Sequence, residues 1–143
     1  MSKLVIDASV AAKWFLPSKN EPLAQEALGI LENFASGEIQ LIVPDLFWAE
    51  MGNILWKAVR VARCTKKTAE LALTSLQQQK LSTVSCANLL TVAFEIATGF
   101  DRSLYDSLYV ALAVQSKSQL VTADERLANS LAAHLPVKWL GAL

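Results

Sequence analysis

The sequence predicts an α/β protein: a three-layer α/β/α fold around a mostly parallel central sheet of about five strands. Short apolar segments alternate along the chain with longer segments of helical periodicity, a pattern typical of strands joined by helical crossovers. Hydrophobic residues make up 53% of the 143 residues, enough to cover both faces of a buried sheet. A chain of this length is expected to form a single domain over residues 1–143.

Apolar segments bounded by polar or turn-forming residues are the predicted strands. They lie at residues 3–6, 39–43, 81–85, 119–122 and 137–140. Between them, apolar residues recur at helical spacing, and the predicted helices cover residues 9–15, 21–35, 46–62, 65–79, 88–98, 104–115 and 124–133. Ligand sites of parallel sheets form beyond the carboxyl ends of the strands, so the residues that follow each strand are the candidates for function.

Capping and breaking residues set the expected helix boundaries. Small polar side chains that can accept a hydrogen bond from a free backbone N–H begin several of these helices: Ser9, Thr65, Ser103 and Asp124. Residues that interrupt a helix or favour its end follow three of them: Pro17, Gly37 and Gly99.

Charge and composition exclude several classes of protein. Thirteen Lys and Arg balance thirteen Asp and Glu, so no overall charge attracts a polyanion, and any contact with nucleic acid is expected to be local. The longest uncharged stretch, residues 81–94, is too short and too polar to span a membrane, and Asp7 interrupts any signal peptide. Cys64 and Cys86 lack paired spacing, which favours reduced thiols and a cytoplasmic location.

Four acidic residues are predicted to meet at one edge of the sheet. Asp7 ends the first strand, and Glu50 lies in the second turn of the helix after the second strand. Asp106 lies in the first turn of a late helix, and Asp124 follows the fourth strand. Unpaired carboxylates at close range repel one another, and a divalent cation removes that repulsion. Ligation by carboxylates and water suits Mg²⁺ or Mn²⁺, which can activate water at a phosphate ester.

Each acid also has a purely structural interpretation. Asp7 could be a turn residue, and Glu50 could be an exposed helical side chain. Asp106 could form a capping box with Ser103, and Asp124 could serve only as a helix N-cap. The convergence of all four positions on one edge favours a site over four separate structural roles.

Motifs of other enzyme classes are missing from the sequence. The five glycines form neither a dinucleotide-binding motif nor a P-loop, and the single histidine, His134, is expected at a helix end on the surface. A phospho-acceptor receiver module has paired acids after its first strand, but here Ala8 follows Asp7. A phosphatase of the haloacid-dehalogenase type has Asp-x-Asp, but Ser9 occupies the third position. Metal-activated water is the chemistry that fits.

Four segments together resemble the PIN domain, and more narrowly the VapC-type toxins of toxin–antitoxin pairs. They are VIDAS at 5–9, PDLFWAE at 44–50, YDSLYVALA at 105–113 and LVTADERL at 120–127. The resemblance extends over nearly the whole chain, in order and at the usual spacing, although residues 63–99 carry no motif. It implies a PIN fold and a Mg²⁺- or Mn²⁺-dependent endoribonuclease that cleaves single-stranded or looped RNA.

The resemblance also assigns roles to residues. Asp7, Glu50, Asp106 and Asp124 match the acidic metal site of the family. Two hydroxyl residues match supporting positions beside these acids: Ser9 and Thr122. The implied partners are an RNA substrate, a cognate antitoxin protein and a second copy of the chain in a homodimer. A PIN nuclease of ordinary RNA processing and a non-catalytic PIN-like binding module are the alternatives.

The helix at 46–62 is a candidate surface for both kinds of partner. Three basic residues follow Glu50 along it and are candidates to bind RNA phosphates, although they could also form a solvated face: Lys57, Arg60 and Arg63. The helix is apolar on more than one face, which suggests a protein interface. Aromatic residues that could contact an antitoxin tail, or simply belong to the core, are Trp14, Phe15 and Trp48.

Overall fold

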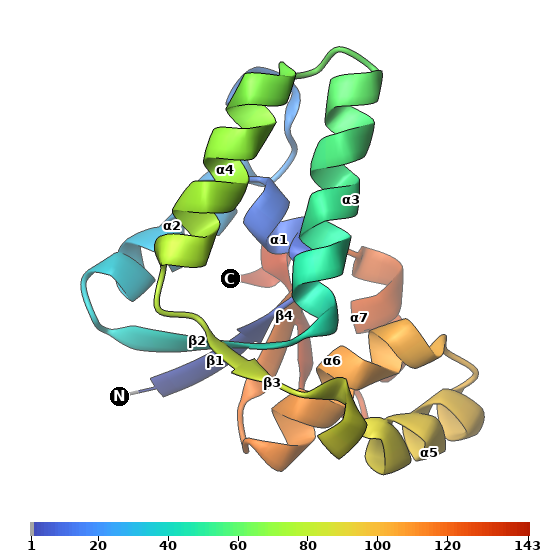
Figure 1. The fold of residues 1–143 in the computed structure, drawn as a ribbon. Coiled ribbons are helices and arrows are strands. Elements are labelled where there is room, and N and C mark those ends of the chain that lie inside the picture. Colours follow the sequence, from blue (N-terminus) through green and yellow to red (C-terminus); the bar gives the residue numbers. More distant parts are fainter. Residues whose placement is uncertain (1) are drawn as a thin grey trace.

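In the computed structural model, which describes residues 2–143, five strands form one parallel sheet (Figure 1). The strands are β1 (Ser2–Ile6), β2 (Ile39–Pro44), β3 (Ser82–Val84), β4 (Gln119–Thr122) and β5 (Val137–Trp139). Their order is β3-β2-β1-β4-β5, so β1 lies at the centre and pairs with β2 and β4. The chain thus moves outward from β1 to one edge of the sheet and then to the other. The predicted fold class is confirmed.

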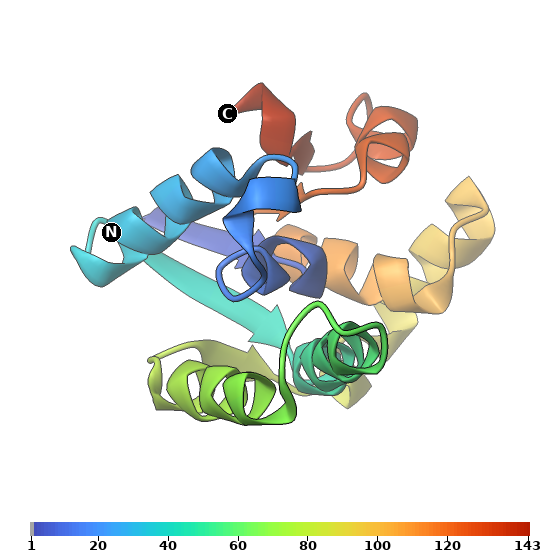
Figure 2. The ribbon, with the colours of Figure 1, turned by 90° about the horizontal axis from the view of Figure 1, so that it is seen from above.

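Helices cover both faces of the sheet. They are α1 (Ala8–Ala12), α2 (Ala24–Ala35), α3 (Leu46–Arg60), α4 (Lys66–Gln78), α5 (Leu90–Phe100), α6 (Leu104–Gln115) and α7 (Glu125–Leu131). In Figure 1, α3 and α4 rise as a pair above the sheet, and α5 and α6 lie below it. Seen from above, α1 lies between α2 and α3 (Figure 2). Three short 3-10 turns, at 18–20, 86–88 and 140–142, complete the elements.

The middle of helix α6 is deeply buried. Residues 107–113 are all buried, and the helix contacts β1, β2 and β4. A helix that is apolar around its whole circumference belongs inside a protein, because no side is suited to solvent. The first turn of α6 nevertheless reaches the carboxyl edge of the sheet, where Asp106 is only partly buried.

Three of the predicted helix caps are confirmed. The side chain of Thr65 accepts a hydrogen bond from the Thr68 amide, and Ser103 accepts one from the Asp106 amide. Asp124 caps α7 by accepting from the Leu127 amide. A cap of this kind is worth about 1 kcal/mol of stability.

Other predicted boundaries were wrong. Asp7, and not Ser9, caps α1, because Ser9 already lies within the helix. The helix predicted from residue 21 begins only at residue 24, since Leu23 has a left-handed backbone with φ of 59°. Helix α5 continues past Gly99 to residue 100 and ends at Asp101, which is also left-handed. Aspartate tolerates that conformation better than most residues, because its short side chain bonds locally.

The long helix α3 buries one stripe and leaves some apolar side chains outside it. Phe47, Met51 and Leu55 are buried, whereas 55% of Trp56 is exposed. The indole of Trp48 is half-buried and donates a hydrogen bond to the Thr83 hydroxyl at 3.1 Å. The expectation of apolar residues on more than one face is therefore met at Trp56.

The aromatic pair at the end of α1 is half-buried. The indole of Trp14 donates to the Ala27 carbonyl at 2.8 Å, which ties α1 to α2, and Phe15 packs against the core beside it.

The uncharged stretch 81–94 forms β3, a 3-10 turn and the start of α5. Within residues 2–143, no helix is long and apolar enough to cross a membrane.

Candidate active site

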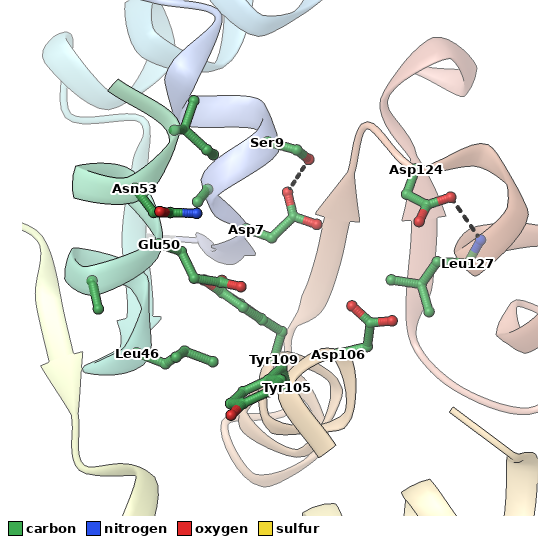
Figure 3. A pocket seen from close by; sticks show the side chains of 13 residues that line it. Asp7, Ser9, Leu46, Glu50, Asn53, Tyr105, Asp106, Tyr109, Asp124 and Leu127 are labelled. Atoms are coloured by element: carbon green, nitrogen blue, oxygen red, sulfur yellow. Dashed lines mark hydrogen bonds between the residues drawn. The ribbon is translucent and has the colours of Figure 1, made fainter. Parts of the chain in front are cut away.

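A pocket of about 450 Å³ opens at the carboxyl edge of the sheet (Figure 3). All four predicted acids line it. The remaining lining residues are Ala8, Ser9, Leu46, Ala49, Asn53, Ile54, Tyr105, Tyr109 and Leu127. The structure thus brings together residues that are as far apart in the sequence as Asp7 and Asp124, as the parallel topology predicts.

Four different elements supply the acids. Asp7 directly follows β1, and Asp124 follows β4, the strand that pairs with β1. Glu50 comes from the second turn of α3, and Asp106 comes from the first turn of α6. Figure 3 shows the carboxylates of Asp7, Glu50 and Asp106 directed into the space between these elements. The site therefore depends on the whole sheet order rather than on any local motif.

Asp7 is held by hydrogen bonds from the Ser9 hydroxyl and the Val10 amide. The Ser9 hydroxyl donates a hydrogen bond to the Asp7 carboxylate and accepts one from the Ala123 amide at 3.3 Å. Ser9 thereby joins the segments that follow β1 and β4. Burial raises the pKa of Asp7 to about 6, and hydrogen bonds from Ser9 and Thr122 oppose that rise. Thr122 is fully buried and also accepts from the Asp124 amide at 3.0 Å.

Glu50 is held by Tyr109, a residue on the opposite side of the pocket. The buried Tyr109 hydroxyl donates to Oε1 of Glu50 at 2.5 Å. Burial raises the pKa of Glu50, and the nearby charge of Asp106 raises it further. Burial and the charges of Glu50 and Asp7 raise the pKa of Tyr109, so it remains a hydrogen-bond donor. The contact joins α3 to α6 across the site.

Asp106 and Asp124 lie at helix N-termini and are more accessible. Oδ1 of Asp124 accepts from the Leu127 amide at 3.2 Å, so this acid both caps α7 and lines the pocket. Oδ2 of Asp106 lies 3.6 Å from Nη2 of Arg102, one turn away, and both side chains are partly exposed. The structural and functional interpretations of these residues are therefore compatible.

The charged side chains that line the pocket are all acidic. Its lining contains four carboxylates and no Lys, Arg or His side chain. Among residues 2–143, no three Asp, Glu, His or Cys side chains lie close enough together to hold one ion as they stand. The acids share a pocket rather than a ready coordination sphere. Hard oxygen donors without a cationic side chain among them are nevertheless the donor set that Mg²⁺ or Mn²⁺ takes.

Asn53 and Tyr109 are polar lining residues that had no predicted role. Asn53 lies one turn beyond Glu50 on α3, and Tyr109 lies one turn beyond Asp106 on α6. Residues three apart on a helix share a face, so this spacing was the available signal. It does not show that the Tyr109 hydroxyl reaches another helix.

A second pocket of about 540 Å³ lies next to the first, and Ile54 lines both. Its other lining residues are Leu16, Lys57, Ala58, Arg60, Val61 and Arg63. All three predicted RNA-binding residues are thus placed together.

The three cations are not equivalent. Arg63 forms an ion pair with Glu21 at 2.9 Å, and Glu21 also pairs with the buried Lys13 at 2.9 Å. Lys57 and Arg60 are exposed and have no ion-pair partner in the part of the chain that the structure describes.

By its fold and site, this protein is of the class of α/β/α domains that have an acidic pocket at the carboxyl edge of a five-stranded parallel sheet. The chain belongs to the PIN domain family, whose model matches residues 4–130. It is 32% identical over 133 residues to Ribonuclease VapC3 of Pyrobaculum aerophilum, and the match covers 92% of this chain and 96% of that relative. The resemblance of the four sequence segments is therefore confirmed.

Solved structures share the fold. VapBC2 of Rickettsia felis, bound to a DNA fragment from its promoter, matches with a TM-score of 0.69 and 14% identity, over 96% of this chain and 98% of that one. VapC20 of Mycobacterium tuberculosis, a toxin that cleaves the sarcin-ricin loop, matches with a TM-score of 0.65 and 17% identity, over 92% of this chain and 95% of that one. At these identities the likeness shows a common fold.

Proposed function

We propose that the chain is a single-domain, metal-dependent endoribonuclease that cleaves single-stranded or looped RNA. The observation that carries this proposal is the pocket itself, whose lining contains four carboxylates from four elements and no basic side chain. Arg102 approaches one of the four, Asp106, to 3.6 Å from outside that lining. The family and the relative named a ribonuclease support the choice of RNA as substrate. A non-catalytic binding module would have no need of partly buried acids such as Asp7 and Glu50, which cost stability.

We propose Asp7, Glu50, Asp106 and Asp124 as the residues that hold Mg²⁺ or Mn²⁺. When bound, the ion would activate a water molecule and neutralise charge that develops on the phosphate. Asp106 and Asp124 are accessible enough to change rotamer, so they can adjust to a ligand. Ser9 holds Asp7 in place, and Thr122 accepts a hydrogen bond from the Asp124 amide.

Tyr109 and Glu50 form the other fixed part of the proposed centre. The hydrogen bond from Tyr109 restricts the Glu50 carboxylate to one orientation. Glu50 then faces the pocket between Asp7 and Asp106, and its charge interacts with both. Preorganised carboxylates of this kind need little rearrangement when the substrate binds.

Cleavage is expected to stop when divalent metal is removed. The purified protein should cut a single-stranded RNA with Mg²⁺ or Mn²⁺, lose the activity in excess EDTA, and regain it when either ion is added back. The measurement is the appearance of labelled fragments on a denaturing gel. Cleavage that persists in EDTA would contradict the metal mechanism.

We propose that Lys57 and Arg60 bind the RNA backbone next to the acidic pocket, with Arg63 as a third, ion-paired contact. Lys57 lies seven residues beyond Glu50, about 10 Å along the same helix face. The double variant Lys57→Ala with Arg60→Ala should weaken RNA binding about tenfold and reduce its salt dependence, because two phosphate contacts are lost.

The control for this double variant replaces two other basic residues with alanine, at a different place on the surface. Lys66→Ala with Lys67→Ala removes two exposed cations of α4 that line neither pocket. Fluorescence anisotropy with a labelled single-stranded RNA measures the affinity, and calorimetry with Mn²⁺ checks that metal affinity is unchanged. Equal RNA affinities in all three proteins would assign the two residues to a solvated face.

We further propose that the chain acts in the cytoplasm as the toxin of a toxin–antitoxin pair, as a homodimer neutralised by an antitoxin protein. Its relative and the solved VapBC neighbours support this assignment. Expression of the chain alone should arrest growth, and co-expression of the protein encoded beside it should relieve the arrest. Growth unaffected by expression of an active chain would favour a nuclease of ordinary RNA processing.

A further inference from the structure

The two pockets adjoin at Ile54 along a single face of α3, and together they are called the groove. Glu50, Ile54, Lys57 and Val61 are spaced four, three and four residues apart, so they lie on one side of the helix. Glu50 lines the first pocket, Ile54 lines both, and Lys57 and Val61 line the second. Helix α1 and the residues after it form the opposite wall, with Ser9 at the acidic end and Leu16 at the other.

The chemistry changes along this groove. The first pocket is acidic, whereas the second has apolar walls from Leu16, Ile54 and Val61 with cations beside them. The guanidinium of Arg60 lies 5.4 Å from the centre of the Trp56 ring, a cation–π contact that restricts its orientation. Arg63 is held by Glu21, so it is fixed as well. The second pocket therefore presents apolar surface with positive charge placed beside it.

We propose that the second pocket is a base-binding subsite for a nucleotide close to the scissile phosphate. The base packs against Leu16, Ile54 and Val61, and Lys57 and Arg60 bind the adjoining phosphates. A flat apolar group joined to negative charge is what single-stranded nucleic acid offers, and it complements these walls and cations. The assignment rests on the proposed ribonuclease function and adds to it a defined place for one unpaired base, which also sets a condition on the substrate at that nucleotide.

That condition concerns the state of the RNA. A base can enter a side pocket only when it is unpaired and unstacked from its neighbours. The groove therefore favours RNA that is single-stranded on one side of the cleaved bond, and a continuous duplex cannot supply the nucleotide. With only a few cations along the groove, recognition depends on the base as well as on the backbone.

The experiment combines a modified RNA with a substitution in the pocket. Asp7→Asn protein, in which cleavage is blocked, is titrated with a labelled single-stranded RNA and with copies that carry one abasic site at each position in turn. One abasic position should weaken binding about tenfold, because base packing is lost there while the phosphates remain. Val61→Glu, added to the same background, should weaken binding of the intact RNA about tenfold and abolish the difference between intact and abasic RNA.

Leu71→Glu is the matched control. Leu71 and Val61 are 61% and 66% exposed, so neither substitution threatens the core, and Leu71 lines neither pocket. Equal affinity for every abasic RNA, or unchanged affinity in Val61→Glu, overturns the subsite and leaves the second pocket to a protein partner. A wild-type protein that cleaves no RNA with either metal ion overturns the proposed function itself, so the two failures are distinguishable.

Discussion

Replacing Asp7 with Asn is expected to reduce RNA cleavage about a thousandfold and to leave the fold intact. Asp7 directly follows the central strand of the sheet and is the acid with the most fixed surroundings, since it accepts hydrogen bonds from Ser9 and from the Val10 amide. Asparagine can accept the same two bonds, but it carries no charge to hold a cation. The loss should therefore appear in kcat and in metal affinity rather than in structure.

The measurement is single-turnover cleavage of a labelled RNA, with circular dichroism as a check on folding. Asp101→Asn is the matched control, because it makes the same chemical change at an exposed acid that does not line the pocket. This control should cleave at the wild-type rate. Activity that survives both Asp7→Asn and EDTA would exclude the proposed mechanism.

The same substitution is expected to stabilise the protein at neutral pH when metal is absent. Burial raises the pKa of Asp7 from 3.8 to about 6, so the folded state holds a proton that the unfolded state releases in this range. The free energy of unfolding therefore falls as pH rises from 3.8 to about 6, and the cost persists above that range. The asparagine side chain has no proton to lose, so Asp7→Asn should gain about 2–3 kcal/mol at pH near 7 and little at pH near 4.

Urea unfolding of both proteins in EDTA, at the two pH values, measures this difference. The comparison is between variant and wild type, because the remaining carboxylates titrate in both. Asp101→Asn, the same change at an exposed acid outside the pocket, is measured alongside as the control for the substitution itself. Added Mg²⁺ or Mn²⁺ should reduce the advantage of the variant, since a cation that binds only the folded wild type stabilises it. Equal stability of the two proteins at neutral pH would show that Asp7 bears no desolvation cost.

The elements with the clearest local signals are the ones that the sequence allows to be predicted. Apolar runs marked the strands, and the caps at Thr65, Ser103 and Asp124 were identified because each depends on one side chain and an amide three residues away. The start of α2 was not predictable in this way. It depends on the left-handed backbone of Leu23, and neither leucine nor the flanking residues favour that conformation.

In the candidate site too, some features could be predicted from the sequence and others could not. The four acids could be proposed because topology alone brings the ends of parallel strands together, and the family motifs contain them. The Tyr109–Glu50 bond joins residues 59 apart, and the Arg63–Glu21 pair joins residues 42 apart. Contacts of this kind depend on how helices pack across a groove. Periodicity describes one helix at a time and cannot reveal them.

The two halves of the groove share α3, which carries Glu50 at the acidic end, and differ in the other elements that form them. Asp106 and Tyr109 belong to α6, whose residues 107–113 are enclosed by the core, whereas Lys57 and Arg60 stand on the projecting pair of α3 and α4. Substitutions in the last turn of α3 and in α4, away from Glu50, can alter which RNA is bound without replacing an acid of the reacting centre. The specificity for RNA and the cleavage activity can therefore change separately as this sequence evolves.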